Sequence, residues 1–394
     1  MSYELLTVGT VPGYVAARPS LAGFGEVTRV REVGDGNLNL VFVVETTGGG
    51  LVLKQALPYV RVDPTWPMTP ERNGIEGRAL RVHNTVAAGL VPALHDTDAE
   101  RHVIAIEDLS DHQVWRGALN EGLRHDGVAH DLGRYVAKVG FGTSVFGLGA
   151  KAHKAAVAAS ANPELCEITE DLVFTEPYIT HEHNRILPGN VADVAAYAGD
   201  PAVRAAIGAA KLAFMTHAEA LIHGDLHTGS VLVRDEPHST RAFDVEFACY
   251  GPVGFDLGAL WGNYVLAAAR AVALGDSGHA AWVLAQAGET WQGFADEFAA
   301  LWPERADPRV IDLDRYLAKV YGDAVAFGAA KAARRVIGFS SVSDIASLPE
   351  DLRVRAIRAV LAAARSLLVE EVRLGEPKPL FDRVGEVLAE VGGR

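Results

Sequence analysis

Cysteine is scarce in this chain, which has 394 residues but only two cysteines, Cys166 and Cys249. Two cysteines are too few for a disulfide framework and lack the spacing of a zinc site, so we expect a reducing compartment, the cytoplasm by default. The sequence contains no uninterrupted apolar run of the ~18 residues that a membrane span requires, and no basic region preceding an apolar stretch at its start. These absences predict a soluble globular protein.

Positive charge is also in deficit, because 36 lysines and arginines face 50 aspartates and glutamates, which gives a formal net charge of −14. A broad cationic surface for nucleic acid or for acidic lipid is therefore not expected, and phosphorylated small molecules would need local cations or a metal ion. Repeats of fixed period and low-complexity tracts are missing too. The length predicts two or three packed units.

Strand patterns dominate the first hundred residues. Segments 25–33, 38–46 and 51–55 are rich in β-branched and apolar residues and predict an antiparallel meander. A helix is expected from a cap at Thr69 through Glu76 toward His83. A further strand is expected over 101–106, followed by an acidic hinge, and we place the end of this first, β-rich lobe at residue 111.

Helical spacing of alanine and leucine characterises residues 112–394. A short hairpin interrupts it, with strands near 230–233 and 241–244 around a polar turn. The pattern predicts an α+β protein with a small antiparallel β lobe containing one main helix and a larger, mainly helical lobe. The expected helices cover 132–161, 191–221, 257–274, 281–301, 313–337 and 352–374.

The most informative motif is His-Gly-Asp-Leu-His-Thr-Gly-Ser at 223–230, followed by Asp244-Val-Glu246. Phosphoryl transfer to a hydroxyl needs one carboxylate to orient the hydroxyl and accept its proton, and other carboxylates to hold magnesium. Asp225 suits the first role. Asp244 and Glu246 suit the second, since side chains two residues apart in extended backbone point to the same side. Alone, Asp225 would be interpreted as a buried turn aspartate that accepts backbone hydrogen bonds. The second acidic motif at 244–246 favours a catalytic role instead.

The histidines allow another interpretation. His223 and His227 stand four residues apart, as zinc ligands on a helix do, but Gly224 and the strand-like flanks argue against a helix there. A histidine packed behind the catalytic turn is the better expectation for both. His181 and His183 are likewise expected to be a solvated loop pair rather than a metal site.

A nucleotide clamp is visible in outline in the first lobe. Gly34, Gly36 and Asn37 form a glycine turn between two strands, although an ordinary hairpin would have the same pattern. Lys54 ends the next strand and Glu76 on the following helix could orient it through an ion pair, whereas each residue alone would be assigned to the surface. The order of these features along the chain is what favours nucleotide binding.

Together these motifs resemble the protein-kinase-like small-molecule phosphotransferases, which include aminoglycoside and choline kinases, and within them the 5-methylthioribose kinases. As in that family, Asp-x-Glu replaces the Asp-Phe-Gly metal motif, and Ser230 stands where relatives have a metal-binding asparagine. The resemblance covers residues 34 to 338 and implies a bilobal protein-kinase-like fold, Mg²⁺, ATP as co-substrate and a homodimer. One departure from the kinase glycine loop is Asn39, which occupies the position of its last glycine.

The resemblance also implies roles for residues that composition would leave unassigned. Backbone at Glu107, Asp108 and Leu109 would meet adenine, and a loop with Trp66 would cover nucleotide and sugar. The adjacent pair Arg334-Arg335 would reach the active site. Because neighbours on a helix project ~100° apart, one arginine should meet phosphate or sugar while the other braces an acidic partner. The alternatives are a tryptophan that caps the core of the first lobe and an exposed arginine pair.

Asp256 is expected to brace the catalytic turn by hydrogen bonds. The residues predict phosphoryl transfer, and the resemblance implies that the reaction is ATP-dependent phosphorylation of the 1-hydroxyl of 5-methylthioribose in methionine salvage, with Asp225, Trp66 and Arg334 at the substrate. Three alternatives are considered. The first is a related kinase acting on 5-deoxyribose, an aminoglycoside or choline, and the second is a catalytically silent nucleotide-binding module. The third, a structural or interaction protein, has the least support, because the sequence shows no repeat, basic patch or long amphipathic coil. A cationic acceptor would require an acidic or aromatic pocket. The arginine pair instead favours a neutral sugar that acquires a phosphate.

Overall fold

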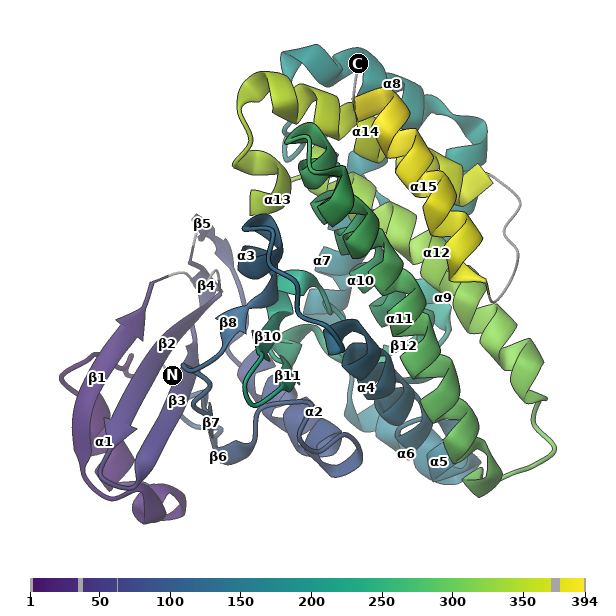
Figure 1. The fold of residues 1–394 in the computed structure, drawn as a ribbon. Helices are drawn as coiled ribbons and strands as arrows, with labels where there is room; N and C mark the ends of the chain where they lie inside the picture. Colours follow the sequence, from purple (N-terminus) through teal and green to yellow (C-terminus); the bar gives the residue numbers. More distant parts are fainter. Residues whose placement is uncertain (1–2, 35–37, 62, 370–375, 393–394) are drawn as a thin grey trace. The chain divides into compact units, whose positions relative to one another are not determined.

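The computed structural model describes residues 3–34, 38–61, 63–369 and 376–392, and the chain divides into two compact units (Figure 1). The first unit consists of Met1–His112 together with Arg241–Ala248. The second consists of Gln113–Thr240 and Cys249–Arg394. The segment that carries Asp244 and Glu246 therefore belongs to the β-rich unit, although the sequence places it after the hairpin of the helical lobe.

The first unit is built on a five-stranded antiparallel sheet of order β1-β2-β3-β7-β6. Side chains two apart in a strand share a face, so Phe42 and Val44 pair with Leu53 and Leu51 to form a fully buried core. The expected meander is confirmed. The unit's elements are α1 Val11–Ala16, η1 Pro19–Phe24, β1 Val27–Val33, β2 Asn39–Thr46, β3 Gly49–Ala56, β4 Tyr59–Val60, β5 Asp63–Pro67, α2 Arg72–Val86, β6 Leu94–Asp98, β7 Val103–Glu107 and η5 Val245–Phe247.

The expected helix is α2, but the predicted cap at Thr69 is wrong. Glu71 precedes the helix and its side chain makes no capping hydrogen bond. The backbone carbonyl of Thr69 instead accepts a hydrogen bond from the guanidinium of Arg72, 3.0 Å away. Arg72 is almost fully buried, so the start of α2 is fixed by a buried arginine rather than by a hydroxyl.

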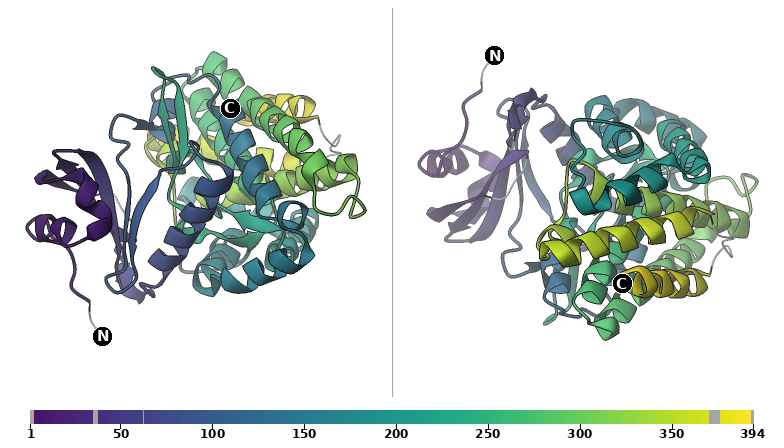
Figure 2. Two further views of the ribbon diagram at one scale, coloured as in Figure 1. Left: turned by 90° about the horizontal axis from the view of Figure 1, so that it is seen from below. Right: turned by 90° about the horizontal axis from the view of Figure 1, so that it is seen from above.

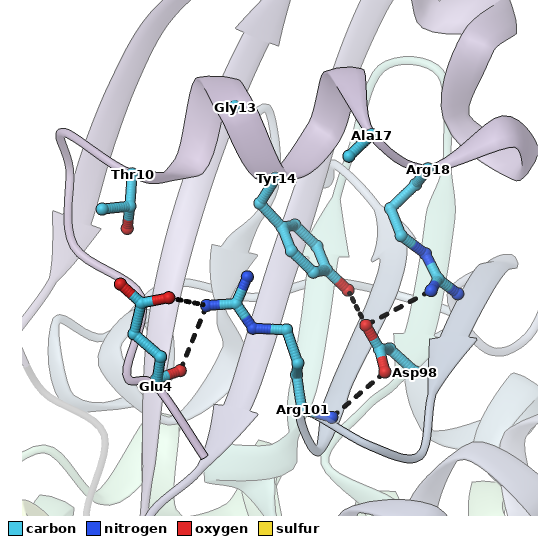
Figure 3. Close-up of a pocket in the computed structure, with 8 residues that line it drawn as sticks. All are labelled: Glu4, Thr10, Gly13, Tyr14, Ala17, Arg18, Asp98 and Arg101. Atoms are coloured by element: carbon cyan, nitrogen blue, oxygen red, sulfur yellow. Dashed lines mark hydrogen bonds and ion pairs between the residues drawn. The ribbon is translucent and has the colours of Figure 1, made fainter.

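A pocket of about 400 Å³ lies between α1 and the loop after β6, and its charged groups are paired with one another (Figure 3). Asp98 accepts hydrogen bonds from the hydroxyl of Tyr14 at 3.2 Å and from Arg18 at 3.3 Å. Arg101 donates to the carboxylate of Glu4 at 3.2 Å. These contacts attach the N-terminal segment to the sheet, and the pocket shares no residue with the candidate site below.

The second unit is mainly helical, and α10 forms its centre because almost every residue of α10 is buried. Helix α12 lies along α10 (Figure 1). A Cβ at Gly258 or Gly262 would come within 2.6 or 2.5 Å of backbone oxygens of α12, so glycine permits this close approach. The remaining large helices, including α14 and α15, pack around this pair (Figure 2). Lys331, Arg334 and Arg335 lie in the last two turns of α12.

The predicted helix bounds agree with the structure where no turn interrupts the alanine and leucine pattern, and they are wrong where a short turn divides it. The 313–337 prediction matches α12, whereas 132–161 is divided into α4, α5 and α6, and 191–221 is divided at Pro201 into α8 and α9. The predicted hairpin is present as β10 and β11. Helices α3, α7 and α15 were not predicted, and residues 370–374 of the last predicted helix lie outside the described residues.

The elements of this unit follow in chain order. They are β8 Gln113–Val114, α3 Trp115–Asn120, α4 Val128–Gly142, α5 Val145–Leu148, α6 Ala150–Ala159, α7 Pro163–Phe174, η2 Glu176–Tyr178, η3 Pro188–Asn190, α8 Val191–Gly199, α9 Pro201–Thr216, β9 Ala220–Ile222, η4 Thr228–Ser230, β10 Val231–Arg234, β11 Ser239–Ala242, β12 Cys249–Gly251, α10 Gly254–Ala273, α11 Ser277–Leu301, η6 Trp302–Glu304, α12 Leu313–Ile337, α13 Ser343–Ala346, α14 Glu350–Val369 and α15 Pro377–Gly392. Among the described residues, no helix is both long and apolar enough to cross a membrane.

Candidate active site

Lys54 is the centre of a charged cluster in the first unit. Its Nζ lies 2.8 Å from Oε1 of Glu76 on α2, which confirms the predicted ion pair, and it also contacts the carboxylate of Asp244. Burial opposes the charge on the lysine, but the attraction of Asp244 and Glu76 is larger and raises the pKa of Lys54 above its ordinary value. The lysine is therefore fully cationic at neutral pH.

Asp244 and Glu246 come together by a route that the sequence did not predict. The expectation of extended backbone is wrong here, because Asp244 has a φ of 69° and a 3-10 turn, η5, follows it. The turn packs against α2 and brings Glu246 beside Glu76. One carboxylate oxygen from each of Glu76, Asp244 and Glu246 lies within 4.8 Å of the other two. Three clustered carboxylates are a suitable donor set for Mg²⁺.

Asn39 accounts for one departure from the kinase glycine loop. Its side-chain amide donates a 2.8 Å hydrogen bond to Oε2 of Glu246, and the guanidinium of Arg72 lies 3.9 Å from the same oxygen. Burial raises the pKa of Glu76 to about 7 and also raises the pKa of Glu246, with Asp244 adding repulsion in both cases. A divalent cation would relieve this repulsion.

The other residues predicted for the nucleotide are placed as follows. Gly34 follows β1, whereas Gly36 and Asn37 lie outside the described residues. Glu107 ends β7 and its carboxylate accepts the backbone N–H of Ala93 at 3.0 Å, while Asp108 and Leu109 follow the strand. Trp66 lies in β5. Contact of these residues with adenine or sugar stays a prediction.

The catalytic turn of the second unit begins where β9 ends. Gly224 has a φ of 83°, a conformation that favours glycine over other residues and turns the chain sharply. Asp256, in the first turn of α10, accepts hydrogen bonds from the backbone N–H groups of His223 at 2.8 Å and Gly224 at 3.1 Å. The predicted bracing role of Asp256 is therefore confirmed. His223 is packed behind the turn, with its Nδ1 accepting the backbone N–H of Asp225.

The carboxylate of Asp225 is surrounded by cationic and donor groups. Its Oδ1 lies 2.7 Å from Nζ of Lys331, and its Oδ2 lies 3.2 Å from Nε2 of His227 and 3.9 Å from a guanidinium nitrogen of Arg335. Burial alone would raise the pKa of Asp225, but Lys331, His227 and Arg335 together lower it well below its ordinary value. Asp225 is therefore ionised at neutral pH.

The two donors beside Asp225 titrate in different ranges. Burial lowers the pKa of Lys331 to about 8, against the attraction of Asp225, so the lysine is cationic at neutral pH but close to losing its proton. Burial lowers the pKa of His227 to about 4, so that ring is neutral and donates a hydrogen bond from Nε2 to Asp225. The hydroxyl of Ser230 hydrogen-bonds the backbone carbonyl of Asp225 at 2.9 Å, which fixes the turn.

The two arginines of the pair have different surroundings. Arg335 is the member that approaches Asp225, and it also donates to the carbonyl of Ser340 at 3.1 Å. Arg334 is buried, and its Nε has no hydrogen-bond partner among the described residues. An unpartnered guanidinium N–H is suited to an anionic group such as a transferred phosphate.

Known proteins match this chain along most of its length. The phosphotransferase enzyme family matches residues 29–287. A methylthioribose kinase from Cronobacter sakazakii is 37% identical over 97% of this chain and 98% of its own, and one from Klebsiella pneumoniae subsp. pneumoniae is 38% identical over 99% and 98%. This chain belongs to the methylthioribose kinase family. A solved glucosamine kinase, 15% identical, covers 98% of this chain and 86% of its own with a TM-score of 0.50, which shows the shared kinase-like fold.

This family consists of ATP-dependent small-molecule kinases, and Lys331 is one residue of the candidate site that the sequence analysis did not identify. The signal was present, because Lys331 and Arg335 are four residues apart and therefore share a helix face. Arg116 and Asp344 were missed as well. The partly buried Arg116 and the fully buried Asp344 form an ion pair of 3.0 Å, and no sequence spacing links two residues so far apart.

Proposed function

We propose that this methylthioribose kinase transfers the γ-phosphoryl group of ATP to the 1-hydroxyl of 5-methylthioribose, in methionine salvage. The relatives that are 37% and 38% identical over nearly the full length support this substrate. The observation in the structure that carries the proposal is the environment of Asp225, an ionised carboxylate held between Lys331, His227 and Arg335. A hydroxyl acceptor needs such a carboxylate, and a developing phosphate needs such cations.

Each residue has a defined task in this reaction. Asp225 accepts a hydrogen bond from the acceptor hydroxyl and takes its proton as the phosphorus–oxygen bond forms. Because the transition state is loose and the proton leaves late, orientation matters more than basicity, which agrees with the low pKa of Asp225. Arg334 and Arg335 neutralise the transferred phosphate, and Lys54 binds the phosphates of the nucleotide.

Glu76, Asp244 and Glu246 would hold Mg²⁺, which would neutralise the phosphate oxygens. The fit is supported by their mutual distances within 4.8 Å and by the raised pKa of Glu76 and Glu246, because both features describe carboxylates crowded without enough positive charge. Glu76 thereby has two tasks, since it also pairs with Lys54. The sequence analysis had assigned only that pairing to it.

The experiment that tests the substrate is ADP release by the purified protein with ATP and Mg²⁺. The acceptors are 5-methylthioribose, 5-deoxyribose, ribose, choline and kanamycin at equal concentrations. The expected result is the highest kcat/KM for 5-methylthioribose, with measurable use of 5-deoxyribose because a small apolar group changes binding by only ~1–3 kcal/mol. A preference for choline or kanamycin would contradict the substrate, and ATP binding without turnover on any acceptor would favour a nucleotide-binding module.

The experiment that tests the mechanism is Asp225→Asn. The variant should bind ATP as the wild type does, while kcat falls at least ~100-fold, the usual scale for removing a general base. Near-normal turnover in that variant would contradict the role of Asp225. The cytoplasmic location expected from the scarcity of cysteine and the homodimer expected from the resemblance are also proposed here, and light scattering on the purified protein tests the oligomeric state.

A further inference from the structure

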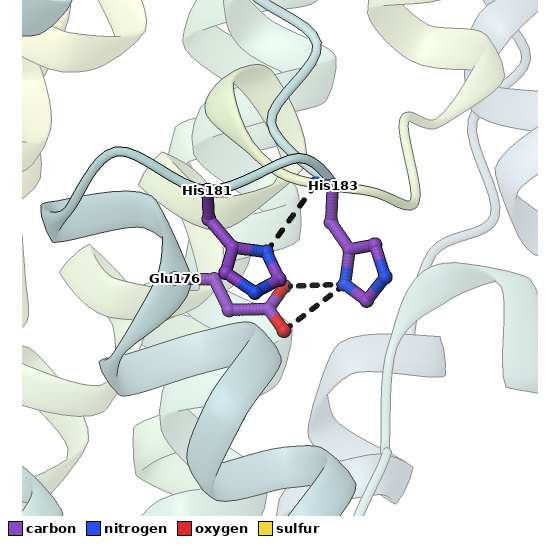
Figure 4. A group of neighbouring side chains, drawn as sticks. All are labelled: Glu176, His181 and His183. Atoms are coloured by element: carbon purple, nitrogen blue, oxygen red, sulfur yellow. Dashed lines mark hydrogen bonds and ion pairs between the residues drawn. The ribbon is translucent and has the colours of Figure 1, made fainter.

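Glu176, His181 and His183 bring their ligating atoms together in the helical unit (Figure 4). Glu176 belongs to η2 and is buried, and the two histidines lie on the loop that follows. Nδ1 of His183 lies 3.0 Å from each carboxylate oxygen of Glu176, and Nδ1 of His181 lies 3.6 Å from Oε2. The sequence analysis expected a solvated loop pair, because it had no reason to include Glu176.

The spacing of these donor atoms matches that of ligands around one metal ion. Zinc binds imidazole nitrogen and carboxylate oxygen at about 2.0–2.2 Å, so tetrahedral ligands lie about 3.3 Å apart. The two observed nitrogen–oxygen distances, 3.0 and 3.6 Å, lie on either side of that value. All three ligand atoms fall within 4.8 Å of one another. A small closure of the histidine loop would therefore complete three sides of a coordination sphere.

The charge at Glu176 is also suited to a cation. Within the described part of the chain, the side chains that form ion pairs with its carboxylate are the two imidazoles, which carry no charge unless protonated. A buried carboxylate is costly without a counter-charge. The backbone N–H of His183 donates to Nδ1 of His181 from 3.3 Å, and a bound ion would replace this hydrogen bond at the same lone pair.

Several further contacts of the loop do not use the ligand atoms. The side chain of Asn184 donates to the backbone carbonyl of Glu176 at 2.9 Å. The backbone N–H of Arg185 donates to the carbonyl of Ile337 at 2.8 Å, and the ring of His183 packs on Phe339. The donors are therefore held near one another before any ion arrives, and the loop adjoins the end of α12.

A second histidine and carboxylate group in the same unit provides a contrast. His217, Glu219 and Asp323 also lie within 4.8 Å of one another. Both of their carboxylates, however, contact the ammonium of Lys319. That group already contains its cation, whereas Glu176 does not have a lysine or arginine partner among the described residues.

We propose that Glu176, His181 and His183 bind one divalent transition-metal ion, with zinc as the best match for two imidazoles and one carboxylate. Side-chain exposures of 30% and 28% for the two histidines leave room for water to complete the coordination. The ion fastens the histidine loop to η2 and so stabilises this part of the helical unit. It takes no part in phosphoryl transfer, and this site does not depend on the proposed substrate.

The test uses the full chain after chelator treatment, with Mg²⁺ and ADP present in excess to saturate the nucleotide site. Co²⁺ is titrated and followed by its visible absorption, and Zn²⁺ binding is then measured by displacement and by calorimetry. We expect one ion per chain, with ligand-field bands of low coordination number and a melting temperature several degrees higher in saturating Zn²⁺. Glu176→Gln and His181→Asn should each weaken binding at least ~10-fold.

Two control variants separate this site from the other acidic groups. Glu219→Gln removes a carboxylate already paired with Lys319, and Asp244→Asn removes one from the proposed Mg²⁺ group; neither should change Zn²⁺ binding. The proposal is overturned if the wild type binds neither Co²⁺ nor Zn²⁺ at micromolar concentration. It is also overturned if binding survives Glu176→Gln and His181→Asn, or if only Asp244→Asn abolishes it. His181 lies on a partly exposed loop, so its variant keeps the test valid should Glu176→Gln fail to fold.

Discussion

Lys331 offers the sharpest test of how the site works, because it is a buried cation in direct contact with the proposed base. Its Nζ lies 2.7 Å from Oδ1 of Asp225, a distance at which two unit charges attract by about 6 kcal/mol at an effective dielectric constant of 20. Arg335 and His227 retain part of the counter-charge when the lysine is removed. We therefore expect Lys331→Met to lower the free energy of unfolding by about 3–5 kcal/mol, the scale for breaking a buried pair on one side.

The same variant should change the pH dependence of turnover. Because the pKa of Lys331 falls from its ordinary 10.5 to about 8, the wild-type lysine is charged below about pH 8 and neutral above it, so kcat should fall above that pH. In Lys331→Arg the side chain keeps its charge, so the fall in kcat should move to higher pH. Lys331→Met should lower kcat at all pH values and abolish the fall in kcat above pH 8. It should also raise the pH at which kcat declines on the acidic side, because Asp225 loses the cation that contributes most to its low pKa.

The assays are urea unfolding followed by tryptophan fluorescence at pH 7 and initial rates from pH 5 to 10. The pH dependence of the free energy of unfolding gives a second test. Between pH 8 and 10.5 the unfolded chain binds the proton that the native lysine has lost, so this group alone makes wild-type stability rise with pH through that range. Lys331→Met should lack that rise. An unfolding free energy within about 1 kcal/mol of wild type, together with an unchanged pH profile, would refute the reasoning.

Other expected outcomes concern the first unit and the helix pair. Lys54→Met should raise KM for ATP ~10-fold or more, because it removes a charged donor and leaves Glu76 unpaired, and steady-state kinetics would show an unchanged KM if this is wrong. Asp244→Asn should raise the Mg²⁺ concentration needed for half-maximal turnover, with an unaltered requirement as the contradicting result. Gly262→Ala should destabilise the protein by at least ~1–3 kcal/mol in urea, since its Cβ would meet a carbonyl oxygen at 2.5 Å, whereas the control Gly288→Ala, with open space around it, should stabilise slightly.

The sequence predicted the parts of this fold that depend on periodicity. The meander of the first unit and the full length of α12 follow from side chains repeating every two or every 3.6 residues, and both are confirmed. Breaks were harder to predict, because a short turn inside an alanine-rich run hardly changes its average pattern. Pro201 nevertheless divides the predicted 191–221 helix, and its presence was the available signal.

Some contacts of the candidate site could be predicted from the sequence, and others could not. Lys54 with Glu76 and the Asp256 brace were predicted because their residue types and order are typical of a kinase, and the structure confirms both sets of contacts. The convergence of Asp244 and Glu246 was predicted on the assumption of extended backbone, and that assumption is wrong. A left-handed residue followed by a 3-10 turn leaves little trace in sequence when that residue is an aspartate rather than a glycine.

Asn39 shows why such details escape sequence reasoning. At that position a glycine would have completed a kinase loop, and the asparagine looked like a weakened motif. In the structure its amide donates to Glu246, 207 residues later in the chain, and so helps to hold a carboxylate of the proposed Mg²⁺ group. The departure at Asn39 and the replacement of Asp-Phe-Gly by Asp-x-Glu are therefore linked, because a glutamate that turns back toward the sheet needs a donor there. We expect Asn39→Gly to impair Mg²⁺ binding more than ATP binding, which separate titrations of metal and nucleotide would distinguish; equal losses would show that Asn39 acts on the nucleotide instead.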